Sequence, residues 1–281
     1  MDNKPIVSVL MAVYNCEEFI SIAIESVLAS TYTNFELIIV DDISPDSSFS
    51  IAKSYALKDD RIKVYQNESN LGDYPNRNKA ASYATGKYIK YVDHDDYIYP
   101  WGLSLLVKMM EDNPQADWGL CSLGQYVKNP FPFLLNPAET YNYNYFVSGI
   151  FHKAPLSSII KTTIFHKAGG FRGIRMAGDF EMWHRLALYY NVLLMPDGIV
   201  WYREHANQES KKIKKFQFTY DKIEVEYLCH QDCPLSKDEV KKICRKNIRL
   251  NFIYLIRNMI KLNFDLCIFS IKRIRLYMKY I

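Results

Sequence analysis

Residues 88–100 read Tyr-Ile-Lys-Tyr-Val-Asp-His-Asp-Asp-Tyr-Ile-Tyr-Pro. The run from Tyr88 to Val92 is largely apolar and rich in aromatic and β-branched residues, which predicts a buried strand. Three carboxylates follow within four residues, those of Asp93, Asp95 and Asp96. Because like charges this close repel one another, a cation is expected beside them. Mg²⁺ takes oxygen ligands and usually binds one or two carboxylates together with substrate phosphates. A solvated acidic turn is the alternative for this stretch alone.

Strand and helix patterns alternate four times before residue 100. Strands are predicted at 6–13, 35–40, 62–66 and 88–92. One helix is predicted at 16–30, with Asn15 as N-cap and Glu18 as its capping-box partner. A second begins after Ser44, with Pro45 at its first position, and a third is predicted at 75–85. This alternation predicts an α/β fold with a parallel sheet and right-handed crossovers.

Beyond residue 100 the pattern is less regular. Helices are predicted at 101–112 and 179–190, a turn at 169–171, and strands at 118–127, 157–161, 192–195 and 199–202. Residues 130–152 are irregular and aromatic, and loops of this length in a compact domain are usually lids or binding loops. For 141–151, a lid over an acceptor and packing in the core both remain open.

Charge divides the chain unequally. The 281 residues carry a net charge of +4, but residues 211–281 hold 17 Lys and Arg against 7 Asp and Glu. An acidic body with a basic tail points to a polyanionic surface, such as membrane headgroups, nucleic acid or an anionic polymer. Three helical patterns fill this tail, near 216–230, 236–256 and 259–280, and Ser236 with Glu239 forms a capping box.

The last two helical patterns carry Arg249, Arg257, Lys261 and Lys272 within wide apolar faces. Helices on an anionic membrane surface and helices packed on the body both fit this pattern. The six cysteines show no disulfide or zinc spacing, which favours reduced thiols in a cytoplasmic protein. No leader is recognised, and no apolar stretch approaches the ~20 residues of a spanning helix. A cytoplasmic location is expected, at the inner membrane face if the tail binds lipid.

Polar residues follow three of the predicted strands. Tyr14-Asn15, Asp41-Asp42 and the acidic run 93–96 should meet at one edge of a parallel sheet. Asp42 could accept hydrogen bonds from a base or from ribose hydroxyls, and Arg77 could face a diphosphate. The chain has no Walker sequence, no G-x-G-x-x-G and no G-x-S-x-G. P-loop, Rossmann-fingerprint and common serine-hydrolase chemistry are therefore not indicated.

Five short segments resemble motifs of family-two glycosyltransferases, in the same order along the chain. They are Ser-Val-Leu-Met-Ala-Val-Tyr-Asn at 8–15, Val-Asp-Asp-Ile-Ser-Pro-Asp at 40–46, Arg-Asn at 77–78, Gly-Lys-Tyr-Ile at 86–89 and Val-Asp-His-Asp-Asp at 92–96. The resemblance covers roughly residues 5–207. It implies the GT-A fold, with a Rossmann-like, mostly parallel central sheet flanked by helices. We therefore expect a GT-A domain over 1–207 and a basic helical extension over 208–281.

The resemblance also implies roles for individual residues on the donor side. Asp93-His94-Asp95 matches the Asp-x-Asp motif, which holds Mg²⁺ or Mn²⁺ against the donor diphosphate, with Asp95 nearest the ion. Asp42 matches the carboxylate near the nucleotide base, and Tyr14 and Glu17 match the adjoining wall of that pocket. Tyr202-Arg203-Glu204-His205 resembles a late motif whose His205 approaches the metal or diphosphate.

On the acceptor side, Gly169-Gly170-Phe171 resembles the turn before the acceptor region. Asp179 matches the general base, for which a plain helix N-cap is the structural alternative. The family has Glu before this Asp, whereas this chain has Gly178, which leaves Glu181 as an alternative base.

The expected function is that of an inverting glycosyltransferase which uses a nucleoside-diphosphate sugar, a divalent metal ion and an Asp base. UDP-sugars are the commonest donors in such enzymes, with dTDP- and GDP-sugars open. The expected acceptor is a glycan or a lipid-linked glycan, as in surface polysaccharide assembly, and no nucleic acid is expected as partner. The alternatives are a sugar nucleotidyltransferase and a non-catalytic nucleotide-binding or membrane-surface protein.

Overall fold

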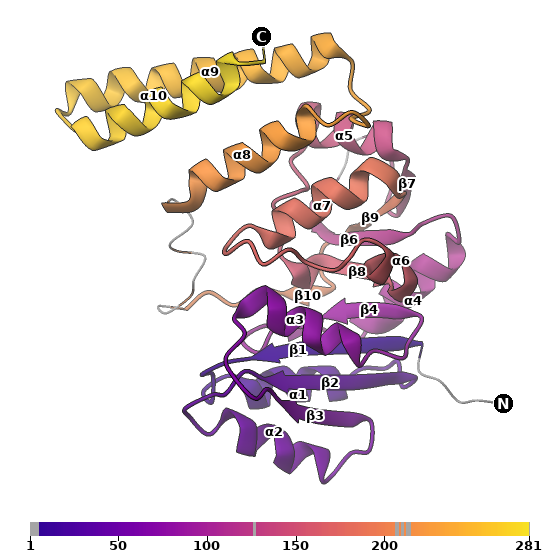
Figure 1. Ribbon diagram of the computed structural model, residues 1–281. Helices are drawn as coiled ribbons and strands as arrows, with labels where there is room; N and C mark the ends of the chain where they lie inside the picture. The colour runs from indigo at the N-terminus through magenta and orange to yellow at the C-terminus, as the bar shows by residue number, and fades with distance from the viewer. Residues whose placement is uncertain (1–5, 126–127, 206–207, 209–210, 212–214, 281) are drawn as a thin grey trace.

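The computed structural model describes residues 6–125, 128–205, 208, 211 and 215–280. Eight strands of this described part form one sheet, in the order β3-β2-β1-β4-β8-β6-β9-β7 (Figure 1). The strands are β1 (Val7–Val13), β2 (Phe35–Asp41), β3 (Ile62–Gln66), β4 (Tyr88–Tyr91), β6 (Trp118–Leu123), β7 (Phe133–Leu135), β8 (Ser158–Lys161) and β9 (Val192–Pro196). Strands β1 to β4 are parallel, as predicted. Strands β8 and β7 run antiparallel to their neighbours, so the second half of the sheet is mixed.

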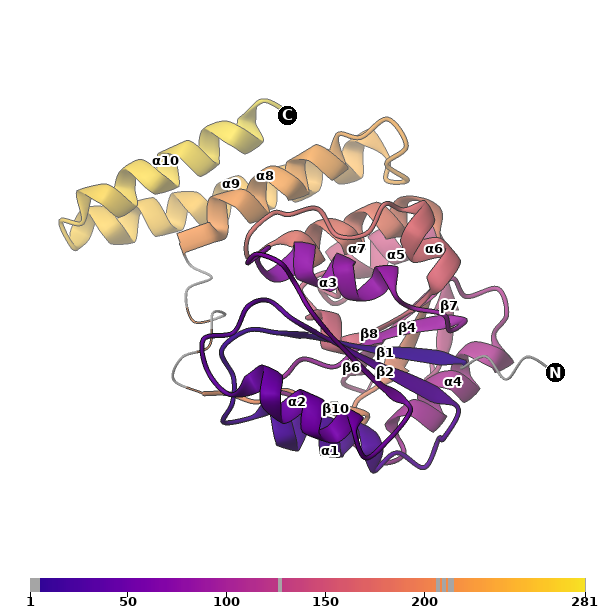
Figure 2. The same cartoon turned by 60° about the horizontal axis from the view of Figure 1, so that its bottom comes forward.

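Helices cover both faces of the sheet (Figure 2). One face carries α1 (Ile20–Leu28), α2 (Ser48–Ala56) and α4 (Gly102–Asp112), and the other carries α3 (Asp73–Ser82), α5 (Pro137–Phe146), α6 (Thr162–Lys167) and α7 (Gly178–Tyr189). Successive strand residues point to opposite faces, so Leu10 joins one core cluster while Val9 and Met11 join the other. Because both faces are covered, every residue of β1, β2 and β4 is buried, and most of these residues are apolar.

Two helices begin later than the sequence predicts. Helix α1 begins at Ile20, and Asn15 does not cap it but lies at a φ of 52° in the left-handed region. Helix α2 begins at Ser48 rather than near Pro45, because Ser44 and Asp46 are engaged in loop hydrogen bonds. The residues between strand and helix therefore form two polar loops at the carboxyl ends of β1 and β2.

The segment 130–152, predicted to be irregular, contains β7 and α5. Helix α5 starts with Asn136 as N-cap in a full capping box with Glu139, and with Pro137 at its first position. Tyr141 is completely buried in the core cluster beneath α7. Packing in the core, rather than a lid, is therefore the structural role of Tyr141. The predicted strand at 118–127 ends at Leu123 as β6, and residues 126–127 lie outside the described residues.

Three helices form the carboxyl-terminal part of the described chain. They are α8 (Gln217–Leu228), α9 (Lys237–Ile260) and α10 (Phe264–Met278), and the predicted Ser236–Glu239 capping box is present. Helix α8 lies beside α7, and α9 and α10 form a hairpin whose far end projects away from the body (Figure 1). No helix among the described residues combines the length and apolar character needed to span a bilayer.

A polar network joins the hairpin to α8. The Arg273 guanidinium donates to both oxygens of the Asp221 carboxylate, with an Nη2–Oδ1 distance of 2.8 Å, and the Asp221 side chain is 4% exposed. Asn247 Nδ2 donates to Glu224 Oε2 at 2.9 Å, and the Tyr277 hydroxyl donates to the same oxygen. The base of the hairpin is thus fastened to α8 by buried polar groups.

Replacing Arg273 by Met should destabilise this junction, because it leaves the Asp221 charge buried without its partner. Loss of one member of a buried ion pair costs about 3–5 kcal/mol. The free energy of unfolding, measured by urea denaturation, should fall by that order. Arg275→Met on the exposed side of the same helix is the matched control and should leave it nearly unchanged. Equal unfolding free energies for the two variants would show that the Arg273–Asp221 pair does not fasten the hairpin.

Candidate active site

A cleft of about 990 Å³ opens at the carboxyl ends of β1, β2 and β4. Its lining includes seven residues predicted for the donor site, namely Tyr14, Glu17, Asp42, Arg77, Asp93, Asp95 and His205. Tyr74 also lines it, and the Tyr74 hydroxyl lies 3.0 Å from Asp179 Oδ1. The fold therefore brings the predicted residues to one place, with Asp179 directly behind the cleft wall.

The loops after β1 and β2 are hydrogen-bonded to each other. Cys16 N donates to Ser48 Oγ at 2.9 Å, and Glu17 N donates to Asp46 Oδ2 at 2.8 Å. In return, Ser47 N donates to Glu17 Oε2 at 2.9 Å. One oxygen of Glu17 thus holds the neighbouring loop, while the ring of Tyr14 is half exposed at the cleft wall.

The carboxylate of Asp42 is used within the protein. It is 2% exposed and accepts hydrogen bonds from Asn67 Nδ2 at 2.7 Å and from Leu71 N and Gly72 N at 2.8 Å each. Gly72, at a φ of 84°, is the N-cap of α3. With these three internal donors the Asp42 oxygens hold the loop that starts α3, and contacts of Asp42 with a base or ribose stay a prediction.

The guanidinium of Arg77 is a cation that lies beside the acidic run. This guanidinium is buried and donates to Asp73 Oδ1 at 2.7 Å and to Asp93 Oδ1. Although burial opposes ionisation, the Arg77 guanidinium holds the pKa of Asp93 below its usual range. Arg77 and Asp93 are thus bound to each other at the cleft, and the contacts of Arg77 with a diphosphate and of Asp93 with a metal ion stay predictions.

Asp95 and His205 meet through a small ribbon. Strand β5 (Tyr97–Ile98) pairs antiparallel with β10 (Val200–Trp201), which places residues 203–205 beside the acidic run. His205 Nε2 lies 3.0 Å from Asp95 Oδ2, and Arg203 Nε donates to the Asp95 carbonyl at 2.8 Å. The late motif and the acidic run are thus one structural unit.

Asp96 is the least satisfied acid of this unit. Its Oδ1 accepts from Arg203 N at 2.9 Å, but its Oδ2 is buried without a partner among the described residues. Burial, followed by the negative charges of Asp93 and Asp95, raises the pKa of Asp96 to about 8. A cation bound next to Asp96 would give its Oδ2 a partner and would offset the negative charges of Asp93 and Asp95.

The donor set fits a divalent ion only in part. Among the described residues, no group of three or more His, Cys, Asp or Glu side chains is arranged to hold a metal ion by itself. Asp95 and His205 offer an oxygen and a nitrogen ligand at the cleft wall. Mg²⁺ commonly binds through one or two carboxylates and takes its other ligands from water and substrate phosphates. The residues present therefore fit a metal ion whose coordination a diphosphate completes.

Asp179 lies in the first turn of α7, whose N-cap is Ala177, so Asp179 is not the helix cap. Its Oδ1 accepts from the Tyr74 hydroxyl and from Phe180 N, the latter at 2.7 Å. Burial raises the pKa of Asp179 to about 6. A carboxylate with this pKa can take up a proton near neutral pH, as a general base requires.

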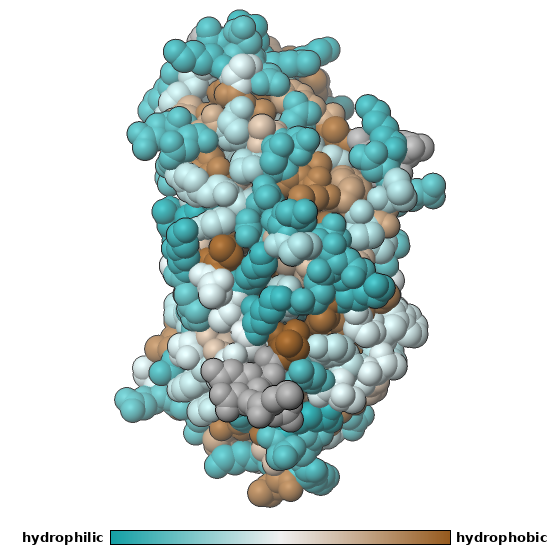
Figure 3. Space-filling model, turned by 90° about the vertical axis from the view of Figure 1, so that its right-hand side faces the viewer, coloured by the Kyte–Doolittle hydropathy of each residue, from teal (hydrophilic) through white to brown (hydrophobic). Residues whose placement is uncertain are grey.

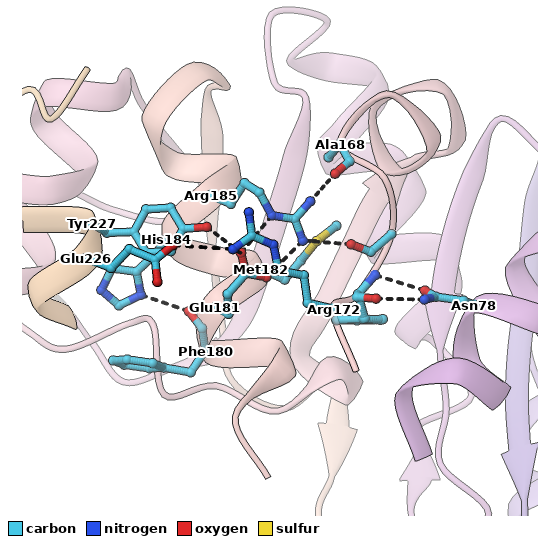
Figure 4. Close-up of polar contacts among 12 residues, drawn as sticks. Asn78, Ala168, Arg172, Phe180, Glu181, Met182, His184, Arg185, Glu226 and Tyr227 are labelled. Atoms are coloured by element: carbon cyan, nitrogen blue, oxygen red, sulfur yellow. Dashed lines mark hydrogen bonds and ion pairs between the residues drawn. The ribbon is translucent and has the colours of Figure 1, made fainter. Parts of the chain in front are cut away.

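Glu181 is enclosed in a separate network (Figure 4). Its side chain is 1% exposed and accepts from Arg185 Nε and Nη2 at 2.9 Å each and from the hydroxyl of Tyr227, and Arg172 Nη1 lies 3.2 Å away. Neither Glu181 nor Asp179 lines the cleft itself, but Asp179 is in contact with Tyr74, which does. This geometry favours Asp179 over Glu181 as the base.

The predicted Gly-Gly-Phe turn is held by α3. Gly169 and Gly170 have φ values of 82° and 67°. Asn78 Nδ2 donates to Phe171 O at 2.7 Å, and Phe171 N donates to Asn78 Oδ1 at 2.9 Å (Figure 4). No role was predicted for Tyr74 or Asp73, and Asn78 was predicted only as part of the Arg-Asn motif. The i, i+4 spacing of Asp73 and Arg77 was the one local signal that could have indicated their pairing.

Residues 8–179 match the protein family described as Glycosyl transferase family 2. EpsE of Bacillus subtilis (strain 168), whose name contains the word glycosyltransferase, is 44% identical over 112 residues, which are 40% of this chain and 40% of EpsE. An uncharacterized glycosyltransferase of Haemophilus influenzae (strain ATCC 51907 / DSM 11121 / KW20 / Rd) is 27% identical over 251 residues, 78% of this chain and 75% of that protein. The match to EpsE thus spans less than half of either protein.

Two solved structures are similar in fold. S. aureus TarS 1–349 in complex with UDP-GlcNAc gives a TM-score of 0.63 at 17% identity, covering 96% of this chain and 91% of that chain. Mannosyltransferase PcManGT from Pyrobaculum calidifontis in complex with GDP-Man and Mn²⁺ gives a TM-score of 0.60 at 18% identity, covering 80% of this chain and 63% of that chain. The α/β GT-A architecture implied by the sequence motifs is thereby confirmed.

Asp179→Asn should stabilise the protein at neutral pH but not at acidic pH. The folded pKa of about 6 lies above the unfolded value, so ionisation of Asp179 costs stability as pH rises from about 4 to 6. Discounted for partial exposure, the penalty is about 1 kcal/mol, or about 2–4 °C in Tm. Tm should be measured for both proteins between pH 4 and 7.

Glu181→Gln is the control for this measurement, because it weakens a buried ion-pair network and should lower Tm at pH 7. A Tm difference between Asp179→Asn and wild type that stays constant from pH 4 to 7 would contradict the burial of an ionised Asp179.

Proposed function

Because the chain belongs to glycosyl transferase family 2, we propose that it transfers a sugar from a nucleoside-diphosphate sugar to a hydroxyl group, with inversion at the anomeric carbon. The observation that carries this proposal is a single cleft with an aspartate at each of two places beside it. Asp95 and His205 lie at its donor side, and Asp179 lies behind Tyr74 at the other. Such a pair separates the tasks of receiving a leaving diphosphate and of deprotonating an acceptor.

The donor is expected to be a UDP-sugar. The names of the similar structures record UDP-GlcNAc in TarS, and GDP-Man with Mn²⁺ in PcManGT. Asp95 and His205 would hold Mg²⁺ or Mn²⁺, which when bound neutralises charge on the departing diphosphate. Arg77 keeps Asp93 ionised and paired, so that the acidic run remains ordered beside the donor.

Asp179 acts on the acceptor in this proposal. Its carboxylate takes the proton of the acceptor hydroxyl as the acceptor oxygen bonds to the anomeric carbon. The bond between that carbon and the diphosphate oxygen breaks on the opposite face, and its electron pair leaves with the diphosphate. General-base catalysis of this kind contributes typically about 10²–10⁴-fold in rate. The acceptor is a glycan or a lipid-linked glycan.

A matched pair of variants tests the two sides of the cleft. Donor binding should be measured by calorimetry with Mn²⁺ and a panel of UDP-, GDP- and dTDP-sugars, and turnover by release of the nucleoside diphosphate. Asp95→Asn should weaken Mn²⁺-dependent binding by about tenfold or more, because a metal ligand is lost. Asp179→Asn should bind the donor normally and lose about 10²–10⁴-fold in turnover.

Each of these assignments can be contradicted by one outcome. Unchanged affinity of Asp95→Asn in Mn²⁺ would remove the metal-ligand role, and retained turnover of Asp179→Asn would remove the base. A wild-type protein that binds nucleotide but releases no sugar from any donor would favour a non-catalytic nucleotide-binding protein.

The carboxyl-terminal extension, residues 208–281, is proposed to bring the cleft to an anionic membrane surface. The far end of its hairpin, residues 250–271, is called the hairpin tip. Large apolar side chains of the tip are exposed at Leu250, Phe252, Ile253, Tyr254, Ile256, Met259, Ile260, Leu262, Phe264, Leu266, Ile268 and Ile271. So many exposed large apolar side chains on one segment mark a surface that another molecule covers.

The positive charges around the hairpin tip favour an anionic lipid surface as the partner that covers it. Arg249, Arg257, Lys261 and Lys272 are exposed on or beside the hairpin tip, where they can reach anionic headgroups. The tip projects on the side of the molecule to which the carboxyl ends of β1 and β2 point (Figure 1). On the side of the molecule away from the tip, apolar residues appear only in small separate groups among hydrophilic ones (Figure 3). An acceptor anchored in the same membrane would then lie near the cleft.

Vesicle co-sedimentation tests this proposal. The wild type should bind phosphatidylglycerol–phosphatidylcholine vesicles and not phosphatidylcholine alone, and Phe252→Ser/Ile260→Ser should lose most of the binding. Leu57→Ser, which removes a side chain 90% exposed at the end of α2, is the matched control and should bind like wild type. A wild type that stays in the supernatant, but forms a dimer that the double variant loses, would make a second copy of the chain the occupant.

A further inference from the structure

Tyr74 connects the donor cleft to Asp179. It is the second residue of α3, its side chain lines the cleft, and the residue is 5% exposed. Its hydroxyl donates to Asp179 Oδ1 at 3.0 Å, across 105 positions of sequence. Its ring packs against Phe171 of the Gly-Gly-Phe turn, with centroids 5.3 Å apart. Tyr74 therefore touches both the cleft and the carboxylate behind it.

Glycine at 178 makes this arrangement possible. A Cβ at position 178 would lie 2.7 Å from Cδ2 and 2.8 Å from Cε2 of the Tyr74 ring, and 2.8 Å from the Arg172 carbonyl oxygen. These distances are shorter than real Cβ contacts, so any side chain at 178 would displace the ring. Position 178 is where the resembled motif has Glu. Here the phenol of Tyr74 fills that space and supplies a hydrogen-bond donor in place of an acid.

We propose that Tyr74 is a positioning residue for the Asp179 carboxylate, and that Gly178 is its structural counterpart. This rests on the proposed role of Asp179 as the base. The hydroxyl holds Oδ1 through a charge-assisted bond and thereby orients the carboxylate, so that its other oxygen can receive the acceptor proton. Tyr74 itself gives up no proton in the step, since its O–H remains donated to Oδ1 throughout.

The groups around Asp179 determine in which direction its pKa moves when the Tyr74 hydroxyl is removed. The charged and titratable groups facing Asp179 are Tyr74, Asp73 and Arg77 of α3, with Tyr220 of α8. Burial raises the pKa of Asp179, whereas the hydrogen bond from Tyr74 lowers it. Removing only the hydroxyl should therefore raise the pKa of Asp179 further and reduce its ionised fraction at neutral pH.

Tyr74→Phe is the test, because it keeps the ring against Gly178 and Phe171 and removes the hydroxyl alone. The titration of Asp179 is followed by NMR of protein labelled with ¹³C at the Asp carboxyl carbons, and Asp179→Asn assigns the signal. The Asp179 midpoint should move to higher pH in Tyr74→Phe. With the best donor of the panel, kcat at pH 7 should fall about tenfold, the acidic limb of the pH profile should shift upward, and donor KM should be unchanged.

Tyr141→Phe is the matched control. Tyr141 is also buried and donates its hydroxyl to α7, at the His184 carbonyl 3.1 Å away. Tyr141→Phe should lower the free energy of unfolding without moving the pH midpoint of the Asp179 titration. Gly178→Ala should move the midpoint upward, as Tyr74→Phe does, because it displaces the ring.

The outcomes separate two failures. An Asp179 midpoint equal in Tyr74→Phe and wild type overturns the positioning role, whether or not a donor has been found. Turnover retained by Asp179→Asn overturns the base assignment instead, and with it the catalytic meaning of the Tyr74 contact.

Discussion

The active-site edge of the sheet depends on one buried guanidinium. Asp93, Asp95 and Asp96 follow a buried strand within four residues, and such a cluster needs compensating charge. Arg77 supplies it from α3, where it lies between Asp73 and Asp93. Asp93 is consequently ionised and held in place, while Asp95 remains at the cleft beside His205. The protein thus satisfies one acid of the run internally and leaves another at the cleft.

Helix α3 organises both sides of the cleft through its i, i+4 spacing. Asp73 pairs with Arg77 one turn further along the helix, and Arg77 reaches Asp93 of the acidic run. Tyr74 and Asn78 lie one residue further on and reach Asp179 and the Gly-Gly-Phe turn. The start of this helix is itself held by Asp42, which accepts from Leu71 N and Gly72 N. Small movements of α3 would therefore displace Asp93 and Asp179 together.

The helix that carries Asp179 is fastened on its other side by the carboxyl-terminal extension. Glu181 of α7 accepts from Arg185 and from Tyr227 of α8, and Arg172 lies between Glu181 and Glu226 of α8 (Figure 4). Helix α8 in turn holds α10 through the Asp221–Arg273 ion pair. The extension is thus continuous with the helix that carries Asp179, while the hairpin tip projects from the molecule.

The sequence by itself determined the parallel strands β1 to β4, the convergence of their polar ends, the family motifs and the Ser236 capping box. These features depend on periodicity and on contacts between residues a few positions apart. The capping box at Asn136 was also local, and it would have predicted α5. The tertiary structure alone decided that Arg77 pairs with Asp93, that Asp42 serves a loop, that β7 and β8 are antiparallel and that Tyr74 meets Asp179. Residues 95 and 205 are 110 positions apart and residues 74 and 179 are 105 apart, so the packing of the whole sheet determines which of these groups meet.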